Sequence, residues 1–155
     1  MEPLLVDRLL LIGELFRKDM ERAFAGTALT TARVHLLWTV HHSGPSTQQT
    51  LARLCGVSPR NITGLVDALV GSGHVRRTPH PTDRRAVLVE LTEPARDLME
   101  RMHREHAELN ESLLHAVAPS DRDAVVRGLA AISSRLEKLV TDAAATGESR
   151  GGGAG

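Results

Sequence analysis

Arg60 and Asn61, two neighbouring residues near the middle of the chain, have side chains suited to hydrogen bonding with the edges of DNA bases. An arginine can donate two hydrogen bonds to a guanine, and an asparagine can form two with an adenine. Both residues follow Ser58 and Pro59, a favoured N-cap and a residue tolerated at the first helical position, so the sequence predicts that a helix begins there. The alternative is a structural helix whose polar face contacts only water. We favour DNA contact by this first turn, with Ser58 and Pro59 included.

Thr63 and Gly64 follow one turn further along the same expected helix. Thr63 offers a hydroxyl for a phosphate oxygen and a methyl group for contact with thymine. A glycine inside a helix costs about 0.5–1 kcal/mol relative to alanine, and a close approach by another molecule would explain that cost. Both residues therefore join the candidate DNA contacts.

A cluster of positive charge lies in residues 76–85. Its four arginines are opposed by one carboxylate, so this stretch carries a net charge of plus three, whereas the whole chain has 19 basic and 19 acidic residues. Arginine is favoured in narrow minor grooves, where the negative potential of DNA is strongest. The alternative is a solvated charged loop. The candidate DNA contacts in this cluster are Arg76, Asp83, Arg84 and Arg85, and Arg77 completes the four arginines.

Two short helices joined by a tight turn are expected to position Arg60 and Asn61. The first is predicted over residues 47–54, with Ser46 as N-cap, because Ser46 and Gln49 have the spacing of a capping box. The second is predicted over residues 59–70. Together they form a helix-turn-helix pattern, in which the second helix enters the major groove. Ser46 and Arg53 are further candidate contacts, although an exposed helical arginine often meets only water.

A two-stranded ribbon is expected to follow the second helix. Residues 75–78 and 86–91 have strand-like composition, and the proline-containing loop between them carries the arginines. The predicted fold class is therefore mainly α with a small β-wing: a winged helix-turn-helix domain plus a helical dimerisation region.

Further helices are predicted over residues 4–25, 30–41 and 92–117, and a last one follows Pro119 with Ser120 as its N-cap. Apolar residues of the last helix repeat alternately every four and three positions, which is typical of a helix that packs on a partner helix. These residues are Val125, Leu129, Ile132, Leu136, Leu139 and Ala143.

These elements divide the chain into four parts. We expect an N-terminal dimerisation helix in 1–29, the DNA-binding domain in 30–92, C-terminal dimerisation helices in 93–145 and a disordered tail in 146–155.

The composition excludes several classes of protein. The 155 residues are 41% hydrophobic and 25% charged, the balance of a globular domain, and contain one cysteine, which excludes an intramolecular disulfide framework. Aromatic residues make up 2%, too few for an RNA-binding sheet that stacks bases. We find no membrane or targeting segment, no nucleotide-binding loop and no catalytic pair, so we expect a cytoplasmic protein that is not an enzyme and needs no cofactor.

Residues 48–54 and 57–69 resemble the helix-turn-helix of the MarR family of bacterial transcription regulators, the part that reads DNA and is called the reading head below. Residues 83–92 resemble the wing of that family. The resemblance covers roughly residues 4–143. It implies an obligate homodimer, assembled through the first, fifth and sixth helices, that binds a pseudo-palindromic operator. Such a protein is usually a repressor that a small molecule or an oxidant releases. By position, Asp83 would fix Arg85 for entry into the minor groove, and Arg84 would contact a phosphate or the groove; a two-residue step in a strand-like segment permits that pairing.

The resemblance also implies an effector cleft lined by the second helix. His35, Trp38 and His42 on that helix and Phe16 on the first helix are the candidate lining residues. Trp38 is equally suited to the hydrophobic core.

The histidines and the cysteine permit other interpretations. His103 and His106 share a helix face, and some members of the family sense zinc, but the spacing matches no strong metal motif, so we expect no metal site. Cys55 is expected to be a small buried residue rather than a redox sensor. The rival from another class is a protein-interaction module whose basic winged-helix face binds an acidic protein.

Overall fold

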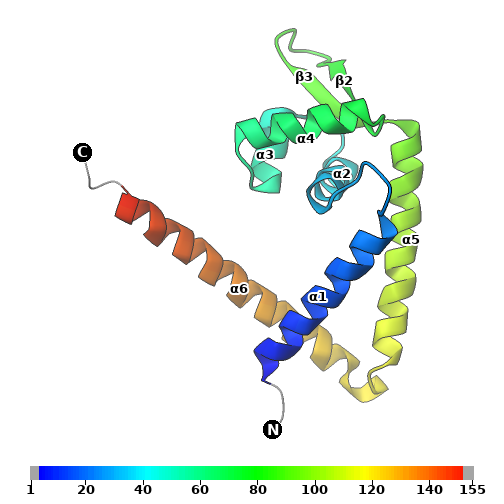
Figure 1. Cartoon of the computed structure of the whole chain (residues 1–155), viewed down its shortest axis with the longest axis vertical. Helices are drawn as coiled ribbons and strands as arrows, with labels where there is room; N and C mark the ends of the chain where they lie inside the picture. Colours follow the sequence, from blue (N-terminus) through cyan, green and yellow to red (C-terminus); the bar gives the residue numbers. More distant parts are fainter. Residues whose placement is uncertain (1–3, 152–155) are drawn as a thin grey trace. The chain divides into compact units, whose positions relative to one another are not determined.

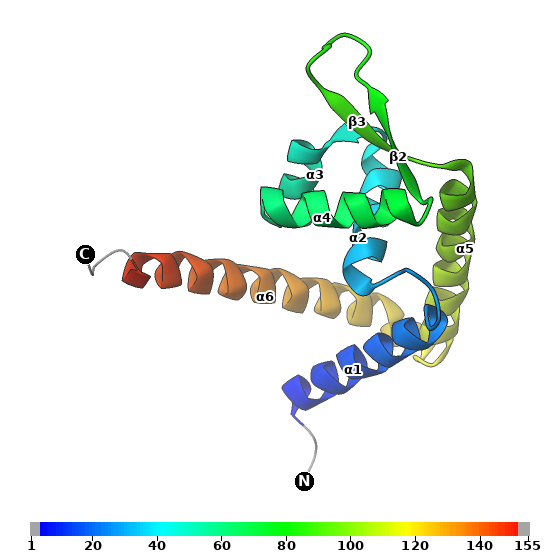
Figure 2. The ribbon, with the colours of Figure 1, turned by 45° about the horizontal axis from the view of Figure 1, so that its top comes forward.

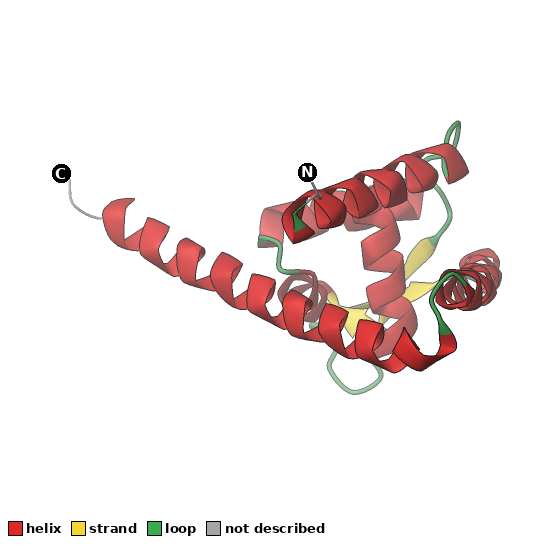
Figure 3. Cartoon of the chain, turned by 90° about the horizontal axis from the view of Figure 1, so that it is seen from below, coloured by secondary structure: helices red, strands yellow, loops and turns green. Residues whose placement is uncertain are grey.

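The computed structural model of this chain describes residues 4–151 and is mainly helical, with one small antiparallel sheet (Figures 1 and 3). Its contacts divide it into two compact units, residues 1–103 and 104–155, so the long helix α5 contributes to both. The helices are α1 (Leu5–Ala23), α2 (Thr31–Ser43), α3 (Gln48–Cys55), α4 (Pro59–Gly71), α5 (Glu93–His115), the 3-10 helix η1 (Pro119–Asp121) and α6 (Arg122–Gly151), and the strands are β1 (Ser46–Thr47), β2 (Val75–Pro79) and β3 (Val87–Leu91).

The sheet has the order β1-β3-β2, with both pairs antiparallel. The prediction of a two-stranded ribbon missed β1, because two residues are too few to show an alternating pattern. Ser46 pairs with Val89 and Thr47 with Leu88, so β1 attaches the start of the helix-turn-helix to the wing. The β2–β3 hairpin extends away from helices α2, α3 and α4 in the same unit (Figure 2).

The hydrophobic core lies in the first unit and holds the helix-turn-helix together. One apolar face each of α2, α3 and α4, both long strands and the start of α5 contribute to it. Trp38 is only half-buried, whereas Leu36, which the sequence pattern did not single out, is fully buried. The largest fully buried side chains are Leu36, Leu37, Leu51, Ile62, Leu69 and Met99.

The N-cap of α3 is Thr47, not Ser46. The Thr47 hydroxyl accepts a hydrogen bond from the backbone N–H of Thr50 at 3.3 Å. Ser46 is 9% exposed, and its hydroxyl donates to the carbonyl oxygen of Gly44 at 3.0 Å. Both residues can cap a helix, and the pairing of β1 with β3 decides between them. The prediction that Ser46 caps α3 is therefore wrong, and Ser46 is largely buried with its hydroxyl bonded within the chain, while its contact with DNA stays a prediction.

The last helix also differs from its prediction at both ends. Ser120 does not cap it: η1 precedes α6, and the Ser120 hydroxyl donates to the carboxylate of Asp121 at 3.0 Å. At the other end α6 continues to Gly151, six residues into the segment predicted to be disordered. Three alanines at 143–145 and the absence of proline favour helix there until the glycine run begins. Residues 152–155 of that segment lie outside the described residues.

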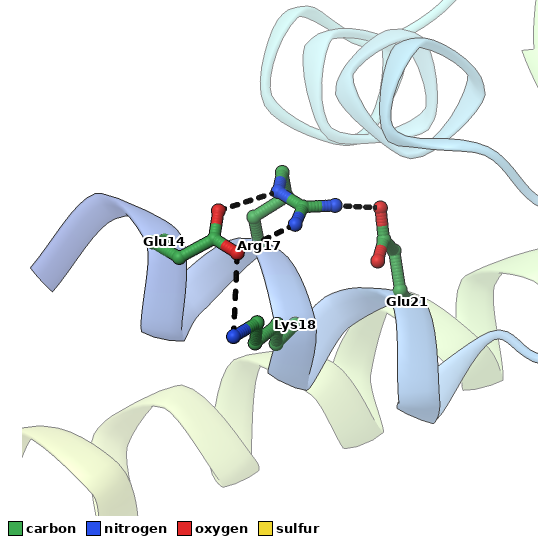
Figure 4. A network of polar contacts seen from close by, with 4 residues as sticks. All are labelled: Glu14, Arg17, Lys18 and Glu21. Atoms are coloured by element: carbon green, nitrogen blue, oxygen red, sulfur yellow. Dashed lines mark hydrogen bonds and ion pairs between the residues drawn. The ribbon is translucent and has the colours of Figure 1, made fainter. Parts of the chain in front are cut away.

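One side of α1 carries a chain of ion pairs (Figure 4). Arg17 binds Glu14 through two hydrogen bonds of 2.7 and 2.9 Å and also binds Glu21, and Lys18 lies 3.4 Å from Glu14. The hydrogen bonds from Arg17 lower the pKa of Glu14 to about 2. Because Arg17, Lys18 and Glu21 are exposed and Glu14 is only partly buried, the network keeps this side of α1 solvated rather than stabilising a core.

Candidate nucleic-acid interface

The helix-turn-helix has the local geometry that its sequence predicts. The Ser58 hydroxyl accepts a hydrogen bond from the backbone N–H of Asn61 at 3.1 Å, and Pro59 is the first helical residue. Between the two helices, Gly56 has a φ of 65°, the left-handed conformation that strains any residue with a Cβ. The cap and the glycine together fix where α4 begins and how it leaves α3.

The N-terminal half of α4 presents an open polar face. Arg60, Asn61, Thr63 and Gly64 are all exposed, whereas Ile62 between them is buried in the core. Within the described residues, no hydrogen bond or ion pair engages the Arg60 guanidinium or the Asn61 side-chain amide. These two groups are therefore available for an external partner.

Gly64 has no structural role within the chain that would require glycine. It lies inside α4 without a positive φ, and a Cβ built there would meet no atom within 4 Å. Nothing in the described chain therefore excludes a side chain at this position.

The four wing arginines divide into two kinds. Arg76 is hydrogen-bonded to Glu90 at 2.6 Å, and Arg77 is hydrogen-bonded to Asp67 and Gln48. Arg84 and Arg85, in the loop between the strands, are exposed and have no ion pair with any described residue. The unpaired positive charge of the wing is thus concentrated at its tip.

Arg77 links three elements. Its guanidinium, on β2, donates to the carboxylate of Asp67 on α4 at 2.5 Å and to the side-chain oxygen of Gln48 on α3 at 3.0 Å. Gln48 in turn donates to the hydroxyl of Thr63 at 3.0 Å, which itself donates to the carbonyl oxygen of Pro59. The sequence analysis did not identify this network, because its members lie 10 to 29 positions apart and no periodicity connects them.

Asp83 and Arg85 are connected, but not as two side chains on a strand. Residues 83–86 form a turn in which the backbone N–H of Ala86 donates to the carbonyl oxygen of Asp83 at 3.1 Å. The Asp83 carboxylate accepts a hydrogen bond from the backbone N–H of Arg85 at 2.9 Å. The expected fixing of Arg85 therefore acts on its main chain and leaves the guanidinium without a partner among the described residues.

Three of the four expected effector-cleft residues line one open groove. His35, Trp38 and His42 lie on α2, and the groove is completed by Thr39, Ser43 and Leu54. The rings of Trp38 and His42 are 5.4 Å apart, and His42 Nδ1 is hydrogen-bonded to the carbonyl oxygen of Trp38. Phe16, on α1, does not line this groove.

The remaining candidate residues are placed as follows. Arg53 is exposed near the end of α3. Cys55 is half-buried, with its sulfur 3.4 Å from the Thr39 hydroxyl. Among the described residues no three histidine, cysteine, aspartate or glutamate side chains are grouped so as to hold a metal ion, and no helix there is long and apolar enough to cross a membrane.

The profile of the MarR family matches residues 29–87 of the chain. The uncharacterized HTH-type transcriptional regulator YfiV of Bacillus subtilis is 33% identical over 110 residues, which cover 70% of this chain and 68% of that protein. The HTH-type transcriptional repressor NicR of Pseudomonas putida is 33% identical over 115 residues, covering 68% and 73%.

Solved structures with the same fold include the following two. RV1404 from Mycobacterium tuberculosis has a TM-score of 0.68 at 29% identity, covering 84% of this chain and 90% of that one. Streptococcus pneumoniae FabT, solved in complex with DNA, has a TM-score of 0.79 at 19% identity, covering 86% and 95%. The chain therefore belongs to the MarR family of transcriptional regulators, as its helix-turn-helix and arginine-tipped wing predict.

Proposed function

We propose that this protein is a homodimeric repressor that binds a pseudo-palindromic operator in the cytoplasm and is released by a small molecule. The observation that carries the proposal is that a few polar side chains of the protein have no hydrogen-bond or ion-pair partner within the described chain. Arg60 and Asn61 on α4 and Arg84 and Arg85 on the wing are exposed, and their side chains have no partner within the described chain. The chain has no formal net charge, yet its unpaired hydrogen-bond donors are concentrated on one helix and one loop. This arrangement suits double-stranded DNA, which offers both phosphates and base edges as acceptors.

In this proposal α4 lies in the major groove and the wing contacts the adjacent minor groove. Arg60 and Asn61 form hydrogen bonds with base edges, while Ser58, Pro59, Thr63 and Gly64 approach the backbone or the groove floor. Arg84 and Arg85 at the wing tip bind where the minor groove concentrates negative potential, and Asp83 orders their turn. Arg53 adds positive charge at the edge of this surface, and Arg76, whose charge is balanced by Glu90, contributes a hydrogen-bond donor there. The solved complex of FabT with DNA and the naming of NicR as a repressor support this assignment.

The dimer is proposed from apolar side chains that the single chain leaves exposed. Leu129, Leu136 and Leu139 of the α6 heptad pattern are exposed, as are Leu11 and Leu15 of α1. Solvated leucines at this spacing are stabilised when a second helix covers them. We therefore assign the segments 1–29 and 93–145 to the dimer and the segment 30–92 to DNA.

Effector release is proposed to act through the distance between the two reading heads. A dimer binds tightly because both α4 helices enter successive major grooves about 10 bp apart, so that the second contact forms at a high effective concentration. The groove lined by His35, Trp38 and His42 on α2 offers an aromatic face and imidazole hydrogen bonds to a planar polar molecule. A molecule bound there that favours another head spacing would lower operator affinity.

Gly64→Ala tests the contact between α4 and DNA. The added methyl group meets no atom of the chain, and alanine favours helix, so we expect the free energy of unfolding to rise by about 0.5–1 kcal/mol. In the complex the same methyl group would be forced into a close contact, so operator affinity should fall roughly tenfold. Thermal unfolding and a gel-shift titration at fixed salt measure the two effects.

The control for this variant is Gly71→Ala, because Gly71 is the last residue of the same helix, has no positive φ, and its added Cβ also meets no atom within 4 Å. It should stabilise the chain without changing the interaction of α4 with DNA. Unchanged operator affinity in Gly64→Ala would contradict the proposed docking of α4. Binding that weakens with salt but prefers no duplex sequence would instead favour a basic surface for an acidic protein.

A further inference from the structure

His80 occupies a distinct position at the tip of the wing. The loop residues 81–85 are all exposed, whereas His80 and Ala86, at its two ends, are half-buried. The backbone N–H of His80 donates to the carbonyl oxygen of Ala86 at 3.1 Å, which closes the loop just beyond the last strand pair. The His80 imidazole is therefore held at the base of the loop that carries Arg84 and Arg85.

One nitrogen of that imidazole organises the turn. His80 Nδ1 accepts hydrogen bonds from the backbone N–H of Asp83 at 3.0 Å and from that of Thr82 at 3.2 Å. Asp83 then accepts from the backbone N–H of Arg85 through its carboxylate. A continuous series of hydrogen bonds thus leads from the ring to the main chain of Arg85.

We propose that His80 is a positioning residue that forms the wing tip in its DNA-binding conformation before DNA arrives; this rests on the proposed function. Accepting two N–H groups requires a lone pair on Nδ1, so the ring is the neutral tautomer with its hydrogen on Nε2. Without that acceptor, Thr82 and Asp83 lose their intramolecular partner and the loop samples other conformations. Arg84 and Arg85 would then have to be ordered during binding, which lowers affinity.

Two substitutions separate the roles of the two ring nitrogens. The side-chain oxygen of asparagine lies the same number of bonds from Cα as His80 Nδ1, and asparagine readily accepts from backbone N–H groups two residues ahead. The side-chain oxygen of glutamine lies one bond further out, in the place of Nε2. His80→Asn therefore keeps the acceptor that organises the turn, whereas His80→Gln and His80→Ala remove it from that place.

The experiment compares these three variants with the wild type as full-length chains. Amide hydrogen exchange at Thr82 and Asp83 is measured without DNA, and operator affinity is measured at fixed salt. We expect His80→Asn to retain amide protection and to bind within about threefold of wild type, and His80→Gln and His80→Ala to lose protection and bind roughly tenfold more weakly. All variants should unfold at nearly the wild-type temperature, because the loop lies outside the core.

Different outcomes would overturn different claims. Unchanged amide exchange in all three variants would overturn the role of His80, even in a protein that binds its operator normally. Weak binding of His80→Asn with its amide protection retained, together with near-wild-type binding of His80→Gln, would overturn it in favour of direct DNA contact by Nε2. Failure of the wild type to bind any duplex would overturn the proposed function, while the exchange data would still decide what organises the turn.

Discussion

Leu136→Glu is expected to convert the dimer into monomers and to weaken operator binding about 100-fold or more, because a single reading head loses the high effective concentration of its neighbour. Leu136 is 50% exposed in the single chain, so the substitution removes little from the chain's own packing. Each leucine buried in a helix–helix interface contributes about 1.5–3 kcal/mol to the free energy of dimerisation. Because a symmetric dimer contains the substitution twice, the loss is doubled. A glutamate there would also bury an unpaired charge.

Ser134→Glu is the matched control for this prediction. Ser134 lies two positions before Leu136 on the same helix, outside the heptad pattern, and is exposed. The Ser134→Glu substitution introduces the same charge as Leu136→Glu, so general electrostatic repulsion of DNA affects both variants equally. Sedimentation equilibrium and gel-shift titration measure assembly and affinity; a dimeric Leu136→Glu protein with wild-type affinity would refute the assignment of α6 to the interface.

Exchanging the charges of Asp67 and Arg77 is expected to give the second large effect. Each single reversal, Asp67→Arg or Arg77→Asp, places like charges side by side between α4 and β2 and should weaken operator binding by roughly tenfold or more. The double variant restores an opposite pair across the same elements and should recover most of that loss. We expect this effect because Arg77 is hydrogen-bonded to Asp67 and Gln48 and so positions α4 relative to the wing.

Arg85 provides the contrast with Arg77. Neutralising a side chain that contacts phosphate lowers the dependence of affinity on salt, by about one released counterion per contact. Arg85→Gln should therefore reduce the slope of log affinity against log salt concentration. Arg77→Gln should weaken binding but leave that slope nearly unchanged. A double charge exchange that fails to restore binding, or a reduced slope in Arg77→Gln, would show that Arg77 contacts DNA directly.

The start of α4 could be predicted from the sequence because local chemistry determines it. The Ser58 cap, Pro59 and Gly56 act within a few residues, so their effects do not depend on the rest of the fold. The choice of Thr47 over Ser46 as the cap of α3 could not be predicted in this way. Both hydroxyls suit the role, and a strand pair with residues more than 40 positions away decides it.

The pairing of charges was beyond prediction for the same reason. Arg76, Arg77, Arg84 and Arg85 are equivalent in composition and differ only in what the folded chain places beside them. Glu90, opposite Arg76 on the neighbouring strand, and Asp67 on α4 neutralise two of the four. Likewise His80 gave no signal, because a lone loop histidine becomes a positioning group only when the turn directs two N–H groups at it.

Selection of bound duplexes from a random pool tests the central claim most directly, because it assumes neither an operator nor an effector. A dimer that places two α4 helices in successive major grooves should enrich an inverted repeat whose half-sites are centred about 10 bp apart, with A·T-rich minor grooves where the wings bind. Enrichment of a single asymmetric half-site, or no enrichment over the starting pool, would contradict it.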